Sequence, residues 1–410
     1  MPVVFRNDTE SSGIIFQFED AAMVGSDATR LFEFTGGGVA VLDIDLDNWP
    51  DIFFTQGSDA PALGNPAPTP EAQTAPSPTD QLFRNRQGAS FRAATSSACL
   101  VDGGYSQGCT TGDFDMDGFP DLYIANIGQN QLFQNNGDGT FAPVAVPPSQ
   151  TWTTSCAIAD LTGDGIPDIY DVNHVVAAGV HQKMCRKLGA SVPCDGGQGL
   201  VAEQDRLFAG DGQGSFRDVT EDSGIKAKEG LGLGLVVLKL QDRFGLSVFV
   251  ANDARPNFLF VNHGTSDRAQ FLDEAVIRGV ALSGNGRSQA CMGVAAGDAN
   301  GDGTTDLLMT NFFNDYNTLY LQRDGFFNDS SDSANLIQGS YSQLGFGTQF
   351  LDADLDGDQD LVVTNGDVVD FSTEDALRRY AQQPQFFRNR SGETFEEQSS
   401  DSQFVDWVLR

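Results

Sequence analysis

One pattern of apolar residues, aspartates and glycines recurs along this chain of 410 residues. It reads VAVLDIDLDNWPDIFF at residues 39–54, TTGDFDMDGFPDLYIAN from Thr110 and CAIADLTGDGIPDIYDVN from Cys156. It returns as VAAGDANGDGTTDLLMTN from Val294 and as FLDADLDGDQDLVVTN from Phe350. Because one short copy cannot bury its own apolar residues, the copies must pack against one another in a repetitive fold.

A second element follows each copy of the first. It reads QLFRNRQGASF from Gln81, QLFQNNGDGTF from Gln131, RLFAGDGQGSF from Arg206 and QFFRNRSGETF from Gln385, with weaker versions from Phe258 and Thr318. Each unit therefore holds two strands around an Asp/Gly loop, then a third strand, a Gly-rich turn and a fourth strand. Four antiparallel strands per unit are typical of a propeller blade. We predict an all-β fold, a β-propeller of four-stranded blades.

Six blades are recognisable, and a partial seventh is left open. The segment FRNDTESSGI at residues 5–14 matches FRDVTEDSGI at 216–225, so we expect it to supply the last strand of a blade. Residues 1–410 are expected to form a single propeller domain. Three insertions decorate it, a Pro/Ala-rich surface segment at 58–80, a Cys/His-containing segment at 171–204 and a segment at 366–384.

The loop between the first and second strands of five units carries oxygen side chains at positions 1, 3, 5 and 9. These residues are Asp43, Asp45, Asp47 and Asp51 in loop one; Asp113, Asp115, Asp117 and Asp121 in loop two; Asp160, Thr162, Asp164 and Asp168 in loop three; Asp298, Asn300, Asp302 and Asp306 in loop five; and Asp352, Asp354, Asp356 and Asp360 in loop six. Alternating oxygen ligands with Gly or Asn at position 6 allow a tight loop to surround one hard cation. We predict about five Ca²⁺ ions, with magnesium or manganese as weaker candidates.

Two comparisons sharpen this prediction. An EF-hand loop needs Glu at position 12, where these loops have Phe54, Ile124, Asp171, Met309 and Val363, so the EF-hand alternative fails. The fourth unit places Lys239, Gln241, Arg243 and Ser247 at the ligand positions. We expect this loop four to bind no metal, with Lys239 or Arg243 supplying the positive charge instead.

The cysteines and histidines allow two readings of the insertion at 171–204. A disulfide between Cys185 and Cys194 would close a short loop. Alternatively, His174 and His181 could join these cysteines in a zinc site, although the spacing lacks the paired Cys-x-x-Cys units of zinc-binding motifs.

The formal charge of −33, from 57 acidic and 24 basic residues, argues against binding to nucleic acid or an anionic membrane. No apolar run reaches the roughly 18 residues of a membrane-spanning helix, so we expect no membrane insertion. The sequence also lacks a nucleophile elbow, a P-loop and a zinc-protease motif, and the catalytic residues are unknown.

Taken together, the strand, DxDxDGxxD loop, strand and LF-x-N pattern resembles the FG-GAP/VCBS repeats of integrin-type β-propellers. More narrowly, GGGVAVLDIDLD, VFVANDARPNFLFVN and GRSQACMGVAAGDANGDG resemble blades of the cartilage acidic protein/UnbV (ASPIC) group. The resemblance implies a calcium-stabilised propeller in adhesion or matrix-like roles, extracellular, periplasmic or on the cell surface. We expect the C-terminal UnbV-type domain of that group to be absent from this sequence, so no function of that domain is carried over.

We therefore expect a calcium-binding β-propeller that acts as a secreted ligand-binding or adhesion module, with a protein or glycan ligand. The alternative is a calcium-dependent enzyme on the same scaffold, acting on polysaccharide or in secondary metabolism. Residues that follow strand ends could serve such an enzyme, namely Asp253, Arg255, Asp315, Tyr316, Asp367 and Asp370. Solvated polar loops are the simpler explanation of these six residues, and we expect a binding module rather than an enzyme.

Overall fold

A computed structural model describes residues 3–20, 29–57, 79–176, 184–187, 190–191, 200–241, 243, 245–265, 268–368 and 378–404. The chain divides into two compact units, which are described separately. One comprises Asp8–Lys228 with Thr265–Arg268, and the other comprises Met1–Asn7, Glu229–Gly264 and Ala269–Arg410.

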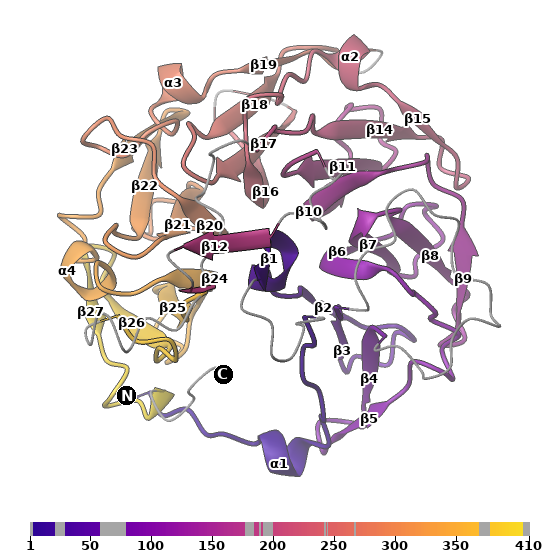
Figure 1. Cartoon of the computed structure of the whole chain (residues 1–410), viewed down its shortest axis with the longest axis horizontal. Helices are drawn as coiled ribbons and strands as arrows, with labels where there is room; N and C mark the ends of the chain where they lie inside the picture. Colours follow the sequence, from indigo (N-terminus) through magenta and orange to yellow (C-terminus); the bar gives the residue numbers. More distant parts are fainter. Residues whose placement is uncertain are drawn as a thin grey trace. The chain divides into compact units, whose positions relative to one another are not determined.

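The unit centred on Asp8–Lys228 contains three sets of four antiparallel strands, of which the last two belong to one eight-stranded sheet (Figure 1). They are β2 (Val39–Leu42), β3 (Asp51–Phe54), β4 (Gln81–Asn85) and β5 (Phe91–Ala93); β6 (Tyr105–Gly112), β7 (Asp121–Gly128), β8 (Gln131–Asn135) and β9 (Phe141–Val144); and β10 (Thr151–Ala159), β11 (Asp168–Asn173), β14 (Arg206–Gly210) and β15 (Phe216–Asp218). The start of β10 also pairs with the end of β7, which joins the last two sheets. A small sheet is formed by β1 (Thr29–Arg30), β12 (Met184–Lys187) and β13 (Ala190–Ser191), and the helical turns are α1 (Thr9–Ser12), η1 (Leu31–Phe34) and α2 (Thr220–Ser223).

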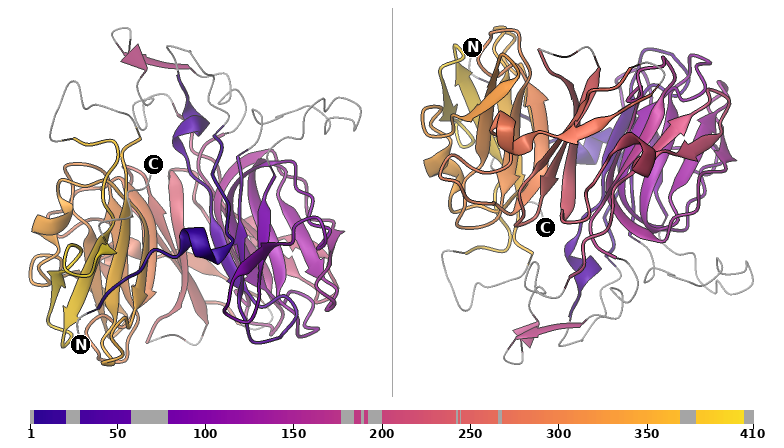
Figure 2. Two further views of the ribbon diagram at one scale, coloured as in Figure 1. Left: turned by 90° about the horizontal axis from the view of Figure 1, so that it is seen from below. Right: turned by 90° about the horizontal axis from the view of Figure 1, so that it is seen from above.

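The other unit repeats the same arrangement three times. Its sheets are β16 (Gly232–Lys239), β17 (Leu246–Asn252), β18 (Phe258–Asn262) and β19 (Phe271–Asp273); β20 (Cys291–Gly297), β21 (Asp306–Asn311), β22 (Thr318–Arg323) and β23 (Phe326–Asp329); and β24 (Gly345–Leu351), β25 (Asp360–Asn365), β26 (Gln385–Arg390) and β27 (Thr394–Glu397). Short helices α3 (Ala275–Arg278) and α4 (Ile337–Ser340) follow β19 and β23. In both units each set of four strands follows the chain order, as an antiparallel meander (Figure 2).

These sheets confirm the predicted fold class, an all-β protein of four-stranded propeller-type units. Each predicted strand–loop–strand copy forms the first two strands of a sheet, and each Leu-Phe element forms the third. Residues 5–7 form no strand, but the Phe5 N–H donates to the Ser402 carbonyl at 2.9 Å, and the Phe5 ring packs on Phe386 and Phe404. The partial seventh blade and the single domain spanning 1–410 remain predictions. The insertion at 58–80 lies almost wholly outside the described residues.

The core lies between neighbouring sheets of one unit. Ala40, Leu42 and Phe53 of the first sheet pack with Leu122 and Phe133 of the second. The second strands are the most deeply buried, and every residue of β7 is buried. Such strands need apolar side chains on both faces, which explains the continuous apolar runs in the sequence. None of the helices among the described residues is long and apolar enough to cross a membrane.

In five sheets, an Asn or Asp just before the third strand forms a hydrogen bond with the backbone at the end of the second strand. Its Oδ1 accepts a backbone N–H, in the pairs Asp80–Gln56, Asn130–Asn126, Asp205–Asn173, Asn257–Asn252 and Asn317–Asn311, over 2.6–3.2 Å. Because Asn and Asp share this acceptor, either residue serves the turn, but Asp brings a charge into a buried place.

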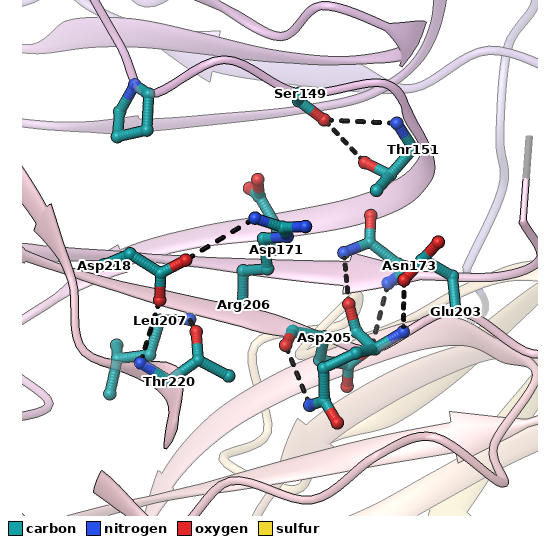
Figure 3. Close-up of polar contacts among 12 residues, drawn as sticks. Ser149, Thr151, Asp171, Asn173, Glu203, Asp205, Arg206, Leu207, Asp218 and Thr220 are labelled. Carbon is teal, nitrogen blue, oxygen red and sulfur yellow. Dashed lines mark hydrogen bonds and ion pairs between the residues drawn. The ribbon is translucent and has the colours of Figure 1, made fainter. Parts of the chain in front are cut away.

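Asp205 shows the cost of that charge. Its Oδ1 accepts the Asn173 N–H at 2.9 Å (Figure 3), and its Oδ2 accepts the Tyr170 hydroxyl at 3.0 Å. Burial raises the pKa of Asp205 to about 8, because these two hydrogen bonds only partly offset the loss of water. In the neighbouring sheet Asn130 occupies the same position, and its amide donates to the Tyr123 hydroxyl at 3.1 Å.

We predict that Asp205→Asn stabilises the protein near pH 7.5. The raised pKa means that the folded state holds a proton which the unfolded chain releases, so wild-type stability falls as the pH rises from about 4 to about 8. The Asn variant lacks this loss, and the expected gain is on the order of 2–5 kcal/mol at pH 7.5 and close to zero at pH 4. Thermal melts at both pH values test this. The reverse change, Asn130→Asp, should lower the melting temperature at pH 7.5, and a destabilised Asp205→Asn protein would contradict the prediction.

Candidate calcium-binding loops

The first aspartate of each predicted loop organises the loop backbone. In loop two the carboxylate of Asp113 accepts the N–H groups of Asp117 at 3.0 Å and Gly118 at 2.9 Å. The same two hydrogen bonds, from positions 5 and 6, are made by Asp43, Asp160, Asp298 and Asp352. In each of the five loops, therefore, the carboxylate at position 1 sets the curvature of the loop backbone.

The middle of each loop is a second turn. At position 5, Oδ1 of Asp47, Asp117, Asp164, Asp302 and Asp356 accepts the N–H of position 7 at 2.9–3.0 Å. Position 6 has a positive φ in every loop, with Asn48 at 69° and Gly118 at 95°. Gly or Asn is required there because other residues pay a steric cost in the left-handed region.

The aspartate at position 9 joins the loop to the third strand. In loop two, Oδ2 of Asp121 accepts the Phe114 N–H at 3.0 Å, and Oδ1 accepts the Asn135 N–H of β8 at 2.8 Å. Asp51, Asp168, Asp306 and Asp360 make the equivalent two contacts. All five of these aspartates are buried. The carboxylate predicted as a metal ligand at position 9 therefore also connects the loop to the third strand through hydrogen bonds.

The charges of these loops are crowded. Carboxylate oxygens of Asp43, Asp45 and Asp51 lie within 4.8 Å of one another, as do those of Asp113, Asp115 and Asp121, and those of Asp352, Asp354 and Asp356. Burial raises the pKa of Asp121 to about 7 and those of Asp168 and Asp306 to about 6, and neighbouring carboxylates add to each rise. A cation would relieve this repulsion.

The donor set fits calcium. Each loop presents oxygen atoms from four side chains, and carboxylate oxygens that accept one N–H keep further lone pairs for an ion. Among the described residues, Oδ1 of Asp45, at position 3, is buried without a hydrogen-bond partner. This oxygen would be satisfied by a metal ion in the loop.

Loop four has the same length but other chemistry. Lys239 is exposed, and it pairs with Leu246 across an extended hairpin. Gln241 accepts the Asp324 N–H at 2.8 Å, and its own N–H donates to Gln322 at 3.3 Å, so it fastens the next sheet. The hydroxyl of Ser247, at position 9, is buried without a hydrogen-bond partner among the described residues. That loop four binds no metal, with Lys239 or Arg243 supplying the charge, remains a prediction.

The third strand adds residues that sequence reasoning missed. Arg84 of β4 forms an ion pair with Asp45, and Arg388 of β26 forms one with Asp354. In the same strand position of β8, Gln134 donates to Asp115 at 2.5 Å. The aligned QLFRN, QLFQN and QFFRN copies all have Arg or Gln at their fourth position. Only the structure shows that this residue contacts a loop aspartate, because the third strand lies beside the loop.

Beside loop one lies an open groove of about 540 Å³. Its lining includes Asp47, Arg84, Arg86, Arg92 and Ser97. Three arginines in one groove stand out in a chain with a formal charge of −33. A second groove, of about 460 Å³, is lined by Gln204, Arg206, Asp218 and Lys228 among others, and Figure 3 shows Arg206 directed at Asp218.

Other predicted residues give a mixed outcome. The Cys185–Cys194 disulfide cannot be followed, because Cys194 and the side chain of Cys185 lie outside what the structure describes, as does His181 of the zinc alternative. Cys99, Cys109, Cys156 and Cys291 are free thiols. His174 is buried edge-on against Trp152, with ring centroids 5.6 Å apart.

The residues suggested for an enzyme make internal contacts. The Tyr316 hydroxyl donates to Asp329 at 2.9 Å, Asp315 accepts the Gln289 amide at 2.8 Å, and Asp367 pairs with Arg378. Burial raises the pKa of Asp253 to about 6. Asp370 lies outside the described residues. These contacts agree with the simpler explanation of solvated and structural loops.

Comparison with known proteins identifies the repeat. The sequence model of one family, the FG-GAP-like repeat, matches residues 43–124 and 113–170, which include loops one, two and three. Residues 43–170 therefore match FG-GAP-like repeats. Cartilage acidic protein 1 of Mus musculus is 28% identical over 211 residues, a match that covers 51% of this chain and 28% of that protein.

Solved structures give weaker likenesses to the whole chain. A lectin from Agrocybe aegerita, described by its recognition of non-reducing terminal N-acetylglucosamine, has a TM-score of 0.49 at 13% identity, covering 92% of this chain and 86% of the lectin. YCF48 bound to a D1 peptide has a TM-score of 0.44 at 9% identity, covering 94% and 88%. These scores are too low to bring a ligand from either protein to this chain.

The two roles of the loop aspartates can be separated in loop two. We predict that Asp121→Asn lowers the melting temperature with or without calcium, because its amide nitrogen must face a backbone N–H that the carboxylate accepts, at a cost of about 1–3 kcal/mol. Asp117→Asn keeps the acceptor for the Phe119 N–H and removes only charge, so it should lower the melting temperature in calcium alone. Melting curves in EDTA and in calcium distinguish the variants, and equal melting of Asp121→Asn and wild type in EDTA would contradict the structural role.

Proposed function

We propose that this protein is a calcium-binding β-propeller module that binds a ligand outside the cytoplasm. The observation that carries the proposal is the hydrogen-bond pattern that the five loops share, together with the close approach of three carboxylates in each of loops one, two and six. A loop so rich in carboxylates is unfavourable without a cation, and oxygen donors in this number favour calcium.

The ions would act mainly by stabilising the loops and the packing between neighbouring sheets. Asn135 of β8 donates to the carbonyl of Ile44 in loop one at 2.8 Å, and Asn389 of β26 donates to the carbonyl of Ala299 in loop five at 2.8 Å. A loop therefore contacts the third strand of the following sheet. An ion that rigidifies the loop would also stabilise the packing between the two sheets.

For the ligand, the groove beside loop one is the best-supported surface. Arg86 and Arg92 line it and are exposed, and guanidinium groups favour carboxylate and sulfate groups through paired hydrogen bonds. We propose an acidic glycan or an acidic protein segment as the ligand class. Secretion and an adhesion role agree with the FG-GAP-like repeat and with the weak homology to cartilage acidic protein 1. The enzyme alternative has no assembled catalytic group among the described residues to favour it.

We predict that EDTA lowers the melting temperature and that added calcium restores it. A ligand that binds only the folded state stabilises it, by about 2.7 kcal/mol per site at a free concentration one hundred times Kd. Differential scanning calorimetry at fixed ionic strength measures the shift, with magnesium as the matched comparison. A melting temperature that does not respond to EDTA or calcium would refute the calcium assignment.

We also predict binding to acidic oligosaccharides on a glycan array in calcium. Arg86→Gln and Arg92→Gln should each weaken the signal several-fold, since each removes one guanidinium from the groove. Neutral oligosaccharides on the same array provide the comparison. Unchanged binding by both variants would exclude this groove, and the absence of any signal would count against a glycan ligand.

A further inference from the structure

We propose that Arg84 and Arg388 are built-in counter-ions that compete with calcium, so that loops one and six bind calcium more weakly than loops three and five. The inference rests on the proposed function, since it assumes that the loops bind calcium. Two arginines outside the loop segments would therefore help to set the calcium affinity of the loops.

Both arginines contact the same two loop positions. Arg84 forms an ion pair with Oδ2 of Asp45, at position 3, and lies 4.0 Å from Oδ2 of Asp47, at position 5. Arg388 forms an ion pair with Oδ2 of Asp354 and lies 3.3 Å from Oδ2 of Asp356, again positions 3 and 5. The two loops lie in different units of the chain, so the contact has arisen in two separate settings.

Beside the other loops, the third strand has different residues at the position of Arg84 and Arg388. The register of β8 places neutral Gln134 there, while β14 has Ala209 and β22 has Leu321. Loops three and five therefore have no cation at this strand position, although Arg323 helps to lower the pKa of Asp302 in loop five, and loop two has a neutral donor. Loops three and five also have only three carboxylates each, with Thr162 and Asn300 at position 3. The arginine on the third strand and the carboxylate at position 3 of the loop therefore occur together in loops one and six, and both are missing from loops three and five.

Competition follows from shared carboxylates. The carboxylates at positions 3 and 5 would hold a calcium ion in the loop, and a guanidinium on Oδ2 of the same groups must move away or remain beside a divalent cation. Without calcium the guanidinium offsets repulsion among the loop aspartates. Loops one and six should therefore keep their shape without metal, whereas loops three and five depend on it.

The test is a calcium titration of the whole chain by isothermal titration calorimetry. Wild type should show a tighter and a weaker class of sites. Arg84→Gln and Arg388→Gln, which copy the Gln of loop two, should each tighten one weak site by about tenfold or more, the change that 1.4 kcal/mol produces. Leu321→Arg, which places a guanidinium beside loop five, should weaken one tight site.

The control is Arg390→Gln. Arg390 lies two residues from Arg388 in β26 but pairs with Glu396 rather than with a loop. Its substitution makes the same change in net charge, so it should leave the weak sites within about twofold of wild type. A similar tightening in Arg390→Gln would mean that overall charge, rather than the local contact, sets the affinity, and would overturn the inference.

Melting in EDTA gives an independent readout. Arg84→Gln and Arg388→Gln should melt below wild type in EDTA, where the counter-ion is lost, and at or above wild type in saturating calcium. Variants whose weak sites are unchanged, or that melt like wild type in EDTA, would overturn the inference while leaving calcium binding intact. A wild-type protein that takes up no calcium would instead refute the proposed function.

Discussion

The buried aspartate at position 9 is the interaction on which the rest of each sheet depends. One carboxylate accepts an N–H from its own loop and another from the third strand, as Asp121 does with Phe114 and Asn135. Asn135 then donates to the loop of the preceding sheet, at Ile44. The chain of contacts runs from loop to strand to neighbouring loop, so whatever holds one loop in place also holds the packing between sheets.

The local part of this design could be predicted from the sequence. Asp at positions 1 and 5 and Gly or Asn at position 6 act within nine residues, and their hydrogen bonds inside the loop follow from spacing alone. The four-stranded units could also be predicted, because each strand copy recurs in the same order. Such features depend on neighbours in the chain, which a sequence displays directly.

The longer contacts could not be predicted in this way. Arg84 contacts Asp45 across the insertion at 58–80, so the pair is not apparent from sequence spacing. The residue before the third strand is another example, because Asp205 and Asn130 look interchangeable as turn formers. Only burial separates them, since a carboxylate and an amide differ little in water but greatly in a closed site.

Arg84 also joins the metal to the proposed ligand surface, because it lines the groove beside loop one and contacts the loop aspartates. A guanidinium held by Asp45 has less capacity to bind an anion in the groove. Calcium in loop one would release that guanidinium, and an anion that engages it would in turn make the loop more favourable for calcium. Because coupling between two binding sites is reciprocal, the two ligands would strengthen each other's binding through this one side chain.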